Sequence, residues 1–378
     1  MKSDYKSLRQ VWKTDRVDWY RCPIERTKLV ELMEPSDLQG WFQTGGHLML
    51  FACTGLLACY LFVEEIWSGF VLALFAHGTV ATFFKGIAAH ELGHGTVFKT
   101  KWLNNFFLRV YSLISWHNFH EYAMSHTYHH KYTLHPEGDR EVVLPMVPGL
   151  NILHLLQLFT FNLFGGPVTS GAVPIIRGTI ETAFGGYRSS VHSTEWNQAL
   201  YEGYPEERMK AVNWARLVLV FHLGVLSIAI AFQFWVLLLV LTFQQFTANA
   251  LKYFVGFPMH CGLRSNVPDF RKCVRSITLD PVSEFLYWHM NWHLEHHMYA
   301  GVPCYNLKKL HRLLAGDMPQ PRTLVGAWRE MRDTWRRQKT NPDYEYDTPV
   351  PTPAARHTAG DDALARSFGD LSPPVLEA

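Results

Sequence analysis

Histidines carry the most distinctive chemistry in this sequence of 378 residues, which contains twenty of them. Three groups stand apart by their spacing: HELGH, HTYHH and HLEHH. On a helix, residues three and four positions apart project from the same face, so each group can aim two or three imidazoles at one point. Together the groups offer eight candidate metal ligands: His90, His94, His126, His129, His130, His293, His296 and His297.

The run HELGH also fits H-E-x-x-H, the signature in which two histidines hold zinc and the Glu activates water in a membrane metalloprotease. Zinc normally takes four ligands, one of them exchangeable in a catalytic site, so eight imidazoles suit two metal ions better. Such a protease would leave the other two groups without a role. Imidazole binds iron, copper, nickel and zinc alike, so ligand type alone does not select the metal.

A metal transporter is a further alternative, and it would place histidines and carboxylates along a path inside the membrane. His77 and His222 lie within apolar stretches but are isolated. We therefore interpret them as structural residues or as residues of a substrate tunnel.

The elements that must position the three groups are apolar segments of membrane length. Residues 47–63 and 66–84 are apolar and are separated only by Glu64 and Glu65. Each approaches the roughly 20 residues that cross a bilayer, which predicts a helical hairpin. A second apolar block is too long for one span, so we predict two more spans, about 213–232 and 234–254, with a turn near Gln233.

Charge predicts the orientation of these spans. The first 46 residues carry eight Lys or Arg, and neither predicted hairpin turn carries any. By the positive-inside tendency, residues 1–46 form a cytoplasmic segment and both hairpins start and end in the cytoplasm. All three histidine groups then lie on the cytoplasmic face, just outside the spans.

Three other segments have recognisable composition. Residues 151–164 are apolar but too short to span, which predicts an interfacial helix or a buried core helix. Residues 322–339 mix tryptophans with several arginines, a pattern that suits an anionic membrane face or a protein partner. From 340 to 378 the chain is rich in Pro, Asp and Ala, and we predict a disordered tail.

We call the three histidine groups HELGH, HTYHH and HLEHH the first, second and third boxes. In this order, and separated by paired hydrophobic spans, they resemble the membrane-bound fatty acid desaturase and hydroxylase superfamily. The resemblance covers about residues 47–311, and the expected membrane domain is 47–339. It implies an all-α integral membrane fold with four transmembrane helices, arranged as two hairpins, under a cytoplasmic helical cap that carries the boxes. It also implies two non-haem iron ions, O2 as co-substrate and electrons from a separate carrier.

Carried over box by box, the eight histidines of the three groups would be the iron ligands. Acyl-CoA desaturases of this superfamily use one more histidine between the second and third boxes, and His260 is the candidate here. Gly256 stands where some of those relatives have an Asn that joins the site through water. His117, His120 and His135 are expected to support ligands or lie on the surface, with direct ligation as the alternative. Asp139, Arg140 and Glu141 could fix ligand tautomers, receive the electron donor or form a solvated loop.

The box pattern favours desaturation, with hydroxylation or oxidative decarboxylation of a fatty acid as the alternatives on the same scaffold. The substrate would be a lipid or a fatty acyl chain. The sequence contains no His-Pro-Gly-Gly motif of a fused cytochrome. An external donor of the ferredoxin, rubredoxin or cytochrome b5 type is therefore expected, and a basic cytoplasmic surface could dock an acidic one. Glu91 and Glu295, inside the boxes, are expected on a helix surface or beside ligands.

Overall fold

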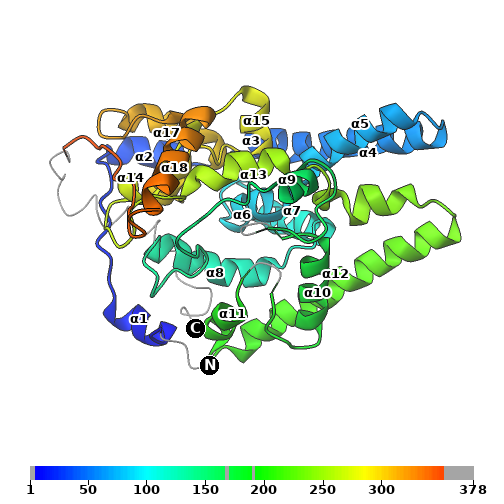
Figure 1. Cartoon of the computed structure of the whole chain (residues 1–378), viewed down its shortest axis with the longest axis horizontal. Helices are drawn as coiled ribbons and strands as arrows, with labels where there is room; N and C mark the ends of the chain where they lie inside the picture. The colour runs from blue at the N-terminus through cyan, green and yellow to red at the C-terminus, as the bar shows by residue number, and fades with distance from the viewer. Residues whose placement is uncertain (1–4, 167–169, 190–191, 353–378) are drawn as a thin grey trace. The chain divides into compact units, whose positions relative to one another are not determined.

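The computed structural model describes residues 5–166, 170–189 and 192–352, and almost all of its regular structure is helical (Figure 1). The chain divides into two compact units. The span unit comprises residues 37–122 and 148–254, and the histidine unit comprises residues 1–36, 123–147 and 255–378. Each unit is described separately below.

The span unit is a set of helices joined by short α, π and 3₁₀ turns, the last two kinds labelled η. Helices α4 and α5 form an antiparallel pair (Figure 1), as the first predicted hairpin requires. The elements are α3 (Asp37–Gly40), η1 (Trp41–Gly45), α4 (Gly46–Val63), α5 (Trp67–Ala81), η2 (Phe84–Ala88), α6 (Ala89–Gly93), α7 (Lys101–Ile114), α9 (Ile152–Phe159), α10 (Ala172–Ala183), α11 (Thr194–Tyr201), α12 (Pro205–Ala231), η3 (Leu238–Thr242), η4 (Gln244–Phe246) and the start of α13 (Ala250–Gly256).

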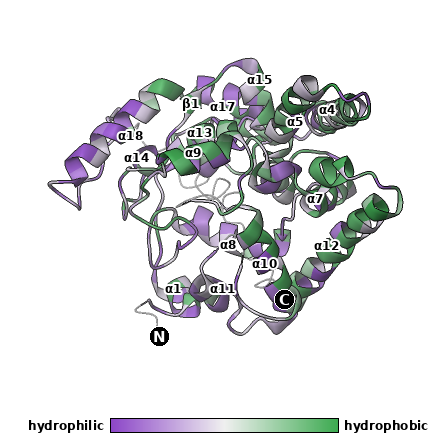
Figure 2. Cartoon of the chain, turned by 45° about the vertical axis from the view of Figure 1, so that its right-hand side comes forward, coloured by the Kyte–Doolittle hydropathy of each residue, from purple (hydrophilic) through white to green (hydrophobic). Residues whose placement is uncertain are grey.

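Three helical segments are long and apolar enough to cross a membrane: Asp37–Val63, Trp67–Gly93 and Pro205–Ala231. Figure 2 shows α4, α5 and the C-terminal part of α12 as largely hydrophobic. Large apolar side chains point outward from them, since Leu56 and Leu72 are each 71% exposed and Val220 is 65% exposed. Apolar surface of this extent on a helix is what lipid contact requires.

The predicted fourth span, 234–254, is not one continuous helix. After Gln233, which has a left-handed φ of 55° at the predicted turn, the chain forms η3 and η4 and then a β-bridge between Phe161 and Thr247. The reason lies in its buried amides. Gln244 Nε2 donates to the Ile114 carbonyl at 2.9 Å, and Asn249 Nδ2 donates to Thr82 Oγ1 at 2.9 Å. These tertiary hydrogen bonds take the place of a regular helical ladder.

Buried histidines inside the apolar segments join neighbouring helices of the span unit. The two ring nitrogens of His77 lie 2.9 Å from Thr54 Oγ1 and 2.9 Å from the Val240 carbonyl. His222 stacks on Trp116 with a centroid separation of 3.9 Å. This supports the structural interpretation of both histidines.

A sharp kink separates α5 from the first histidine box. Lys85 has ψ of 124° and Gly86 has φ of 71°, so both residues leave the helical conformation. Glycine adopts a positive φ without the steric cost that other residues carry, which explains its presence at this point. The kink redirects the chain before α6, which carries His90, and frees the Lys85 carbonyl to accept a hydrogen bond from Lys252 Nζ.

The histidine unit consists of short helices around a two-stranded parallel sheet. Helix α8 enters it from the span unit, and strands β1 (Ile277–Thr278) and β2 (Arg322–Thr323) pair in parallel. The helices are α1 (Leu8–Thr14), α2 (Arg26–Met33), α8 (Phe119–Tyr132), η5 (Phe257–Met259), α14 (Phe270–Cys273), α15 (Pro281–Leu286), α16 (His293–Met298), η6 (Cys304–Asn306), α17 (Leu307–Leu314) and α18 (Leu324–Gln338).

Helix α18 uses its apolar face inside the histidine unit. Ala327 and Met331 are fully buried, and Trp328 stacks on Phe257 at a centroid distance of 5.7 Å. The tryptophan-bearing face that suggested a membrane surface or a partner protein therefore contributes to this unit's own core.

The first part of the predicted disordered tail, after Thr340, makes defined contacts. Ser265 Oγ donates to Glu345 at 2.6 Å, the Tyr346 amide donates to the Gly262 carbonyl at 2.7 Å, and Lys272 pairs with Asp347 at 2.6 Å. Residues 345–347 are thus held on the histidine unit, which the polar composition of the tail did not indicate. The rest of the predicted tail, 353–378, lies outside the described residues.

Candidate metal centre

Two helices and one turn of the histidine unit bring seven histidines close together. The C-terminal half of α8 carries His126, His129 and His130, and α16 carries the whole HLEHH box. Helical spacing of three and four residues directs the imidazoles of each box to one side. His260 follows η5, and all seven side chains are buried: His126, His129, His130, His260, His293, His296 and His297.

Four of these histidines form a compact nitrogen cluster, which we call the four-histidine group. It consists of His129, His260, His293 and His297, whose ligand atoms all lie within 4.8 Å of one another. His293 Nε2 is 3.0 Å from His260 Nε2 and 3.0 Å from His297 Nε2. Metal–imidazole bonds of about 2.1 Å place two donors at right angles about 3.0 Å apart, so this spacing fits a common metal ion.

Hydrogen bonds at Nδ1 leave the Nε2 atoms of this group available as donors to a metal. His260 Nδ1 lies 3.1 Å from the Cys273 carbonyl oxygen, which only accepts, so Nδ1 carries the proton and Nε2 the lone pair. His297 Nδ1 lies 3.1 Å from Thr133 Oγ1. Burial lowers the pKa of His260 to about 3, and the imidazole is therefore neutral at physiological pH, as a ligand must be.

Asp139 orients the fourth ring of the group. Its Oδ2 lies 2.9 Å from His129 Nδ1 and also accepts the Leu134 amide at 2.9 Å. Burial lowers the pKa of His129, but the charge and hydrogen bond of Asp139 outweigh it and raise that pKa above the usual value. A carboxylate behind an imidazole fixes its tautomer and makes it a stronger ligand. Of the roles considered for Asp139, the structure supports the tautomer role.

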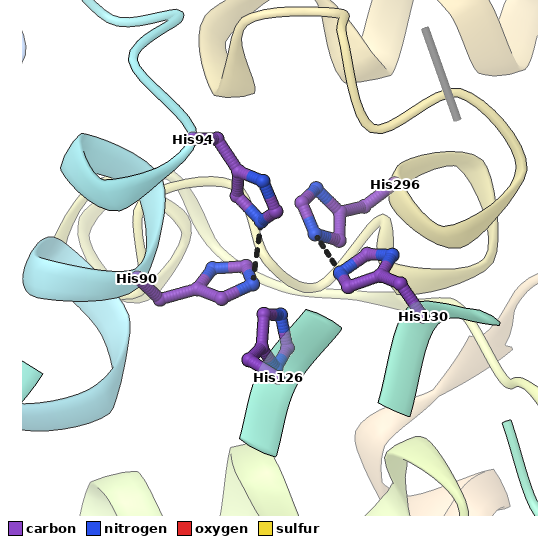
Figure 3. A group of neighbouring side chains, drawn as sticks. All are labelled: His90, His94, His126, His130 and His296. Atoms are coloured by element: carbon purple, nitrogen blue, oxygen red, sulfur yellow. Dashed lines mark hydrogen bonds between the residues drawn. The ribbon is translucent and has the colours of Figure 1, made fainter. Parts of the chain in front are cut away.

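The remaining three of these seven histidines, His126, His130 and His296, lie beside one another. His130 Nε2 and His296 Nε2 are 3.1 Å apart, as one dashed line in Figure 3 marks, and the rings of His126 and His130 meet edge to face at 4.5 Å. Glu141 Oε1 is 3.1 Å from His126 Nδ1, and its other oxygen accepts from Ser125 Oγ at 2.6 Å. Burial raises the pKa of Glu141 to about 7.

The histidines of the first box form a pair in the span unit. On α6 and its C-cap, His90 Nε2 and His94 Nε2 are 3.1 Å apart with their rings perpendicular, and the second dashed line in Figure 3 marks this pair. Glu91 Oε1 lies 3.0 Å from His90 Nδ1. Both nitrogens that meet are Nε2 atoms, as they are in the histidine unit.

Neither box glutamate lies on a helix surface. Glu91 is 1% exposed beside His90, and Glu295 is fully buried. Glu295 accepts from Ser276 Oγ at 2.6 Å and lies 2.5 Å from His311 Nδ1. These contacts hold the middle of α16 in place. Sequence reasoning missed His311 and Thr133, because neither lies at a spacing that relates it to a box.

The three flanking histidines have other surroundings. His117 is buried in the span unit, and His120 packs against Phe119 and Trp214. His135 Nδ1 lies near the carbonyls of Tyr132 and Thr133, and its ring meets Trp19 at 5.3 Å. Among the described residues, the candidate metal groups include none of the three. Arg140 donates to the carbonyls of Lys6 and Glu137, so it anchors the N-terminal segment.

A buried carboxylate stabilises the entry into α16, and its loss should be visible in a pH series. Glu284 accepts from Trp292 Nε1 and Lys308 Nζ, both at 2.9 Å, and lies 3.3 Å from His289 Nδ1. Burial raises the pKa of Glu284, but these hydrogen bonds outweigh it and lower the pKa to about 2 from an ordinary 4.5. The carboxylate therefore stabilises the fold above pH 4.5, and this contribution is lost as the pH falls toward 2.

We expect Glu284→Gln to lower the free energy of unfolding by roughly 1–3 kcal/mol at pH 7. The difference from wild type should narrow below pH 4.5, as melting temperatures at pH 7 and pH 3.5 would reveal. Glu181→Gln, on an exposed ion pair with Arg177, serves as control and should change little at either pH. An unchanged melting temperature at pH 7 would contradict the role given to Glu284.

Comparison with protein families gives one match. The model of the fatty acid desaturase family aligns with residues 65–327, well over half of the chain. The chain belongs to the fatty acid desaturase family. This desaturase-family protein is therefore an oxidoreductase of lipid metabolism associated with membranes, consistent with its three apolar helices. Comparison with curated proteins gave no match.

Proposed function

We propose that this desaturase-family protein introduces a double bond into a fatty acyl chain, using O2, two iron ions and electrons from an external carrier protein. The observation that carries the proposal is the four-histidine group, in which buried imidazole nitrogens converge within the histidine unit. One iron would be held by this group, His129, His260, His293 and His297. The other would be held by His126, His130 and His296, together with His90 and His94 of the first box.

The number of donors supports two metal ions rather than one, and the family resemblance is what favours iron as the metal. Nine imidazoles exceed what one zinc ion takes, and all-nitrogen ligation leaves the metals with their full positive charge. When bound, the two irons would supply the oxidant that removes hydrogen from an unactivated C–H bond. Desaturation balances as one –CH2–CH2– unit, O2, two electrons and two protons giving –CH=CH– and two waters. A ferredoxin, rubredoxin or cytochrome b5 would supply the electrons.

The chain's own residues would hold and orient this centre. Asp139 and Glu141 lie against the Nδ1 atoms of His129 and His126 and fix their ring planes. Burial of the ligands keeps bulk water away from the reacting C–H bond. We further propose a membrane topology of four crossings, in which the interrupted segment 234–254 completes the second hairpin and the boxes face the cytoplasm.

The test is lipid analysis of cells that express the wild type or the His129→Ala/His296→Ala double variant. We expect the wild type to yield acyl chains lighter by two hydrogens and the variant to yield none. A gain of one oxygen would identify a hydroxylase, and a hydrocarbon one carbon shorter would identify a decarboxylase. His135→Ala is the matched control and should keep the product. Purified protein with a single zinc, unaffected by the double substitution, would refute the di-iron proposal.

A further inference from the structure

Two lysines of the span unit lie together beside the kink that precedes the first histidine box. Lys85 is at the kink and Lys252 is on α13, and both side chains are partly buried. Lys252 Nζ donates to the Lys85 carbonyl. The two ammonium charges are close enough to repel each other.

Among the described residues of the span unit, no carboxylate neutralises this pair of lysines. Glu121 is the acidic group that attracts Lys85, but it is engaged elsewhere. Its Oε1 pairs with buried Arg208 at 2.9 Å and accepts from Thr182, while its Oε2 accepts from Ser189 at 3.0 Å. Within the described parts of the chain, neither Lys85 nor Lys252 forms an ion pair.

A buried histidine with free ring nitrogens lies in the field of the same two lysines. His117 is 1% exposed, and within the described residues neither Nδ1 nor Nε2 has a hydrogen-bond partner. Burial, and then the charges of Lys85 and Lys252, lower the pKa of His117 well below its usual value, so the ring is neutral and keeps one N–H to donate. Trp214 Nε1 fixes the backbone of His117 through a 2.8 Å hydrogen bond.

Two partly buried ammonium groups beside a buried imidazole destabilise the fold unless an anionic group binds to them. A charge removed from water without a partner destabilises the fold, and two like charges side by side add repulsion. Lysines at the end of a membrane helix can extend to the headgroup region. That explanation leaves the unpartnered imidazole of His117 without a role. One anionic group would satisfy both ammonium groups and the free N–H together.

We propose that Lys85, Lys252 and His117 form a binding site for the anionic head group of the lipid substrate, a carboxylate or a phosphate. This inference rests on the proposed function, and it narrows the substrate to a lipid whose head group is charged. The site stands five residues before His90, on the same segment and across the Gly86 kink. One stretch of chain would therefore anchor the head group and supply two ligands of the metal centre.

The test measures lipid binding by the purified, metal-free full-length protein in neutral detergent at pH 7. cis-Parinaric acid is the fluorescent probe, displaced by oleate, oleoyl lysophosphatidate or methyl oleate. Lys85→Gln is the informative variant, because Lys252 also supports the kink through its hydrogen bond. Lys85→Arg keeps the charge, and Lys210→Gln removes an exposed lysine that pairs with Glu207.

In the wild type we expect an anionic competitor to bind about tenfold more tightly than methyl oleate, which lacks the charge. Lys85→Gln should remove that advantage, while Lys85→Arg and Lys210→Gln retain it. Whichever anion loses affinity, oleate or lysophosphatidate, identifies the head group as carboxylate or phosphate. Equal binding of methyl oleate and both anions by the wild type overturns the proposal, even if Lys85→Gln fails to fold. An unchanged anion affinity in folded Lys85→Gln also overturns it.

This measurement is independent of the proposed chemistry, because it needs neither iron nor turnover. A protein that binds the anion through Lys85 but alters no lipid in cells would retain the head-group site and lose the desaturase assignment. A protein that desaturates lipids but binds methyl oleate with the same affinity as oleate and lysophosphatidate would retain the desaturase assignment and lose the head-group site.

Discussion

If the proposed function holds, replacing His293 with alanine should lower bound iron from about two ions per chain to about one and abolish lipid desaturation. His293 lies at the middle of the four-histidine group, with its Nε2 3.0 Å from the Nε2 atoms of both His260 and His297. Alanine supplies no donor at that point, and the remaining three nitrogens lose their common neighbour. Elemental analysis of purified protein measures the metal, and lipid analysis of expressing cells measures the product.

His135→Ala is the control for this experiment, because His135 lies in the same unit but outside the metal groups. It should retain both iron ions and the product. If His293→Ala purified with a full complement of iron, the four-histidine group would not be a metal site.

Removing the carboxylate of Asp139 is expected to have the second largest effect. Asp139→Asn should weaken iron binding about 10- to 100-fold, because the amide cannot supply the charge that polarises His129. Asp139→Ala should weaken it further, since the Leu134 amide also loses its acceptor. Titration of the metal-free protein with ferrous iron under anaerobic conditions measures the affinity directly.

Glu137→Gln is the matched control for Asp139, since it removes a nearby carboxylate that contacts the Lys6 backbone and no histidine. It should leave iron affinity unchanged. Equal affinities in the wild type and Asp139→Asn would show that the ring of His129 needs no carboxylate to orient it.

The histidine spacing predicted much of the candidate site, because a three- or four-residue repeat on a helix needs no tertiary information. It predicted that the histidines within each box point to one side, and the family resemblance implied that the boxes share metal ions; the structure brings His129, His293 and His297 together. His260 came only from the family resemblance, since a lone histidine carries no spacing. The sequence could not predict which side chain forms a hydrogen bond with each imidazole ring. Whether Asp139, Arg140 or Glu141 faces a ligand depends on how the loop after α8 turns back, and two of the three do.

Two features of the fold show where composition fails. Residues 234–254 are apolar enough to predict a span, but Gln244 and Asn249 form tertiary hydrogen bonds that interrupt the helix. The tail after Thr340 is polar enough to predict disorder, but Glu345 and Asp347 find partners on the histidine unit. In both segments a few specific contacts outweigh the average character of the sequence, and single-chain composition cannot anticipate such contacts.

The four-histidine group also has a consequence for the path of the chain. Residues 148–254 form a long segment of the span unit. His129 precedes this segment in the sequence, and His260, His293 and His297 follow it. A metal ion bound there would link the residues that precede this segment to those that follow it. These ligands come together only in the folded chain, so a metal that binds them stabilises the native state by mass action. On the proposed function, the supply of iron would then affect the fraction of the protein that stays folded as well as its activity.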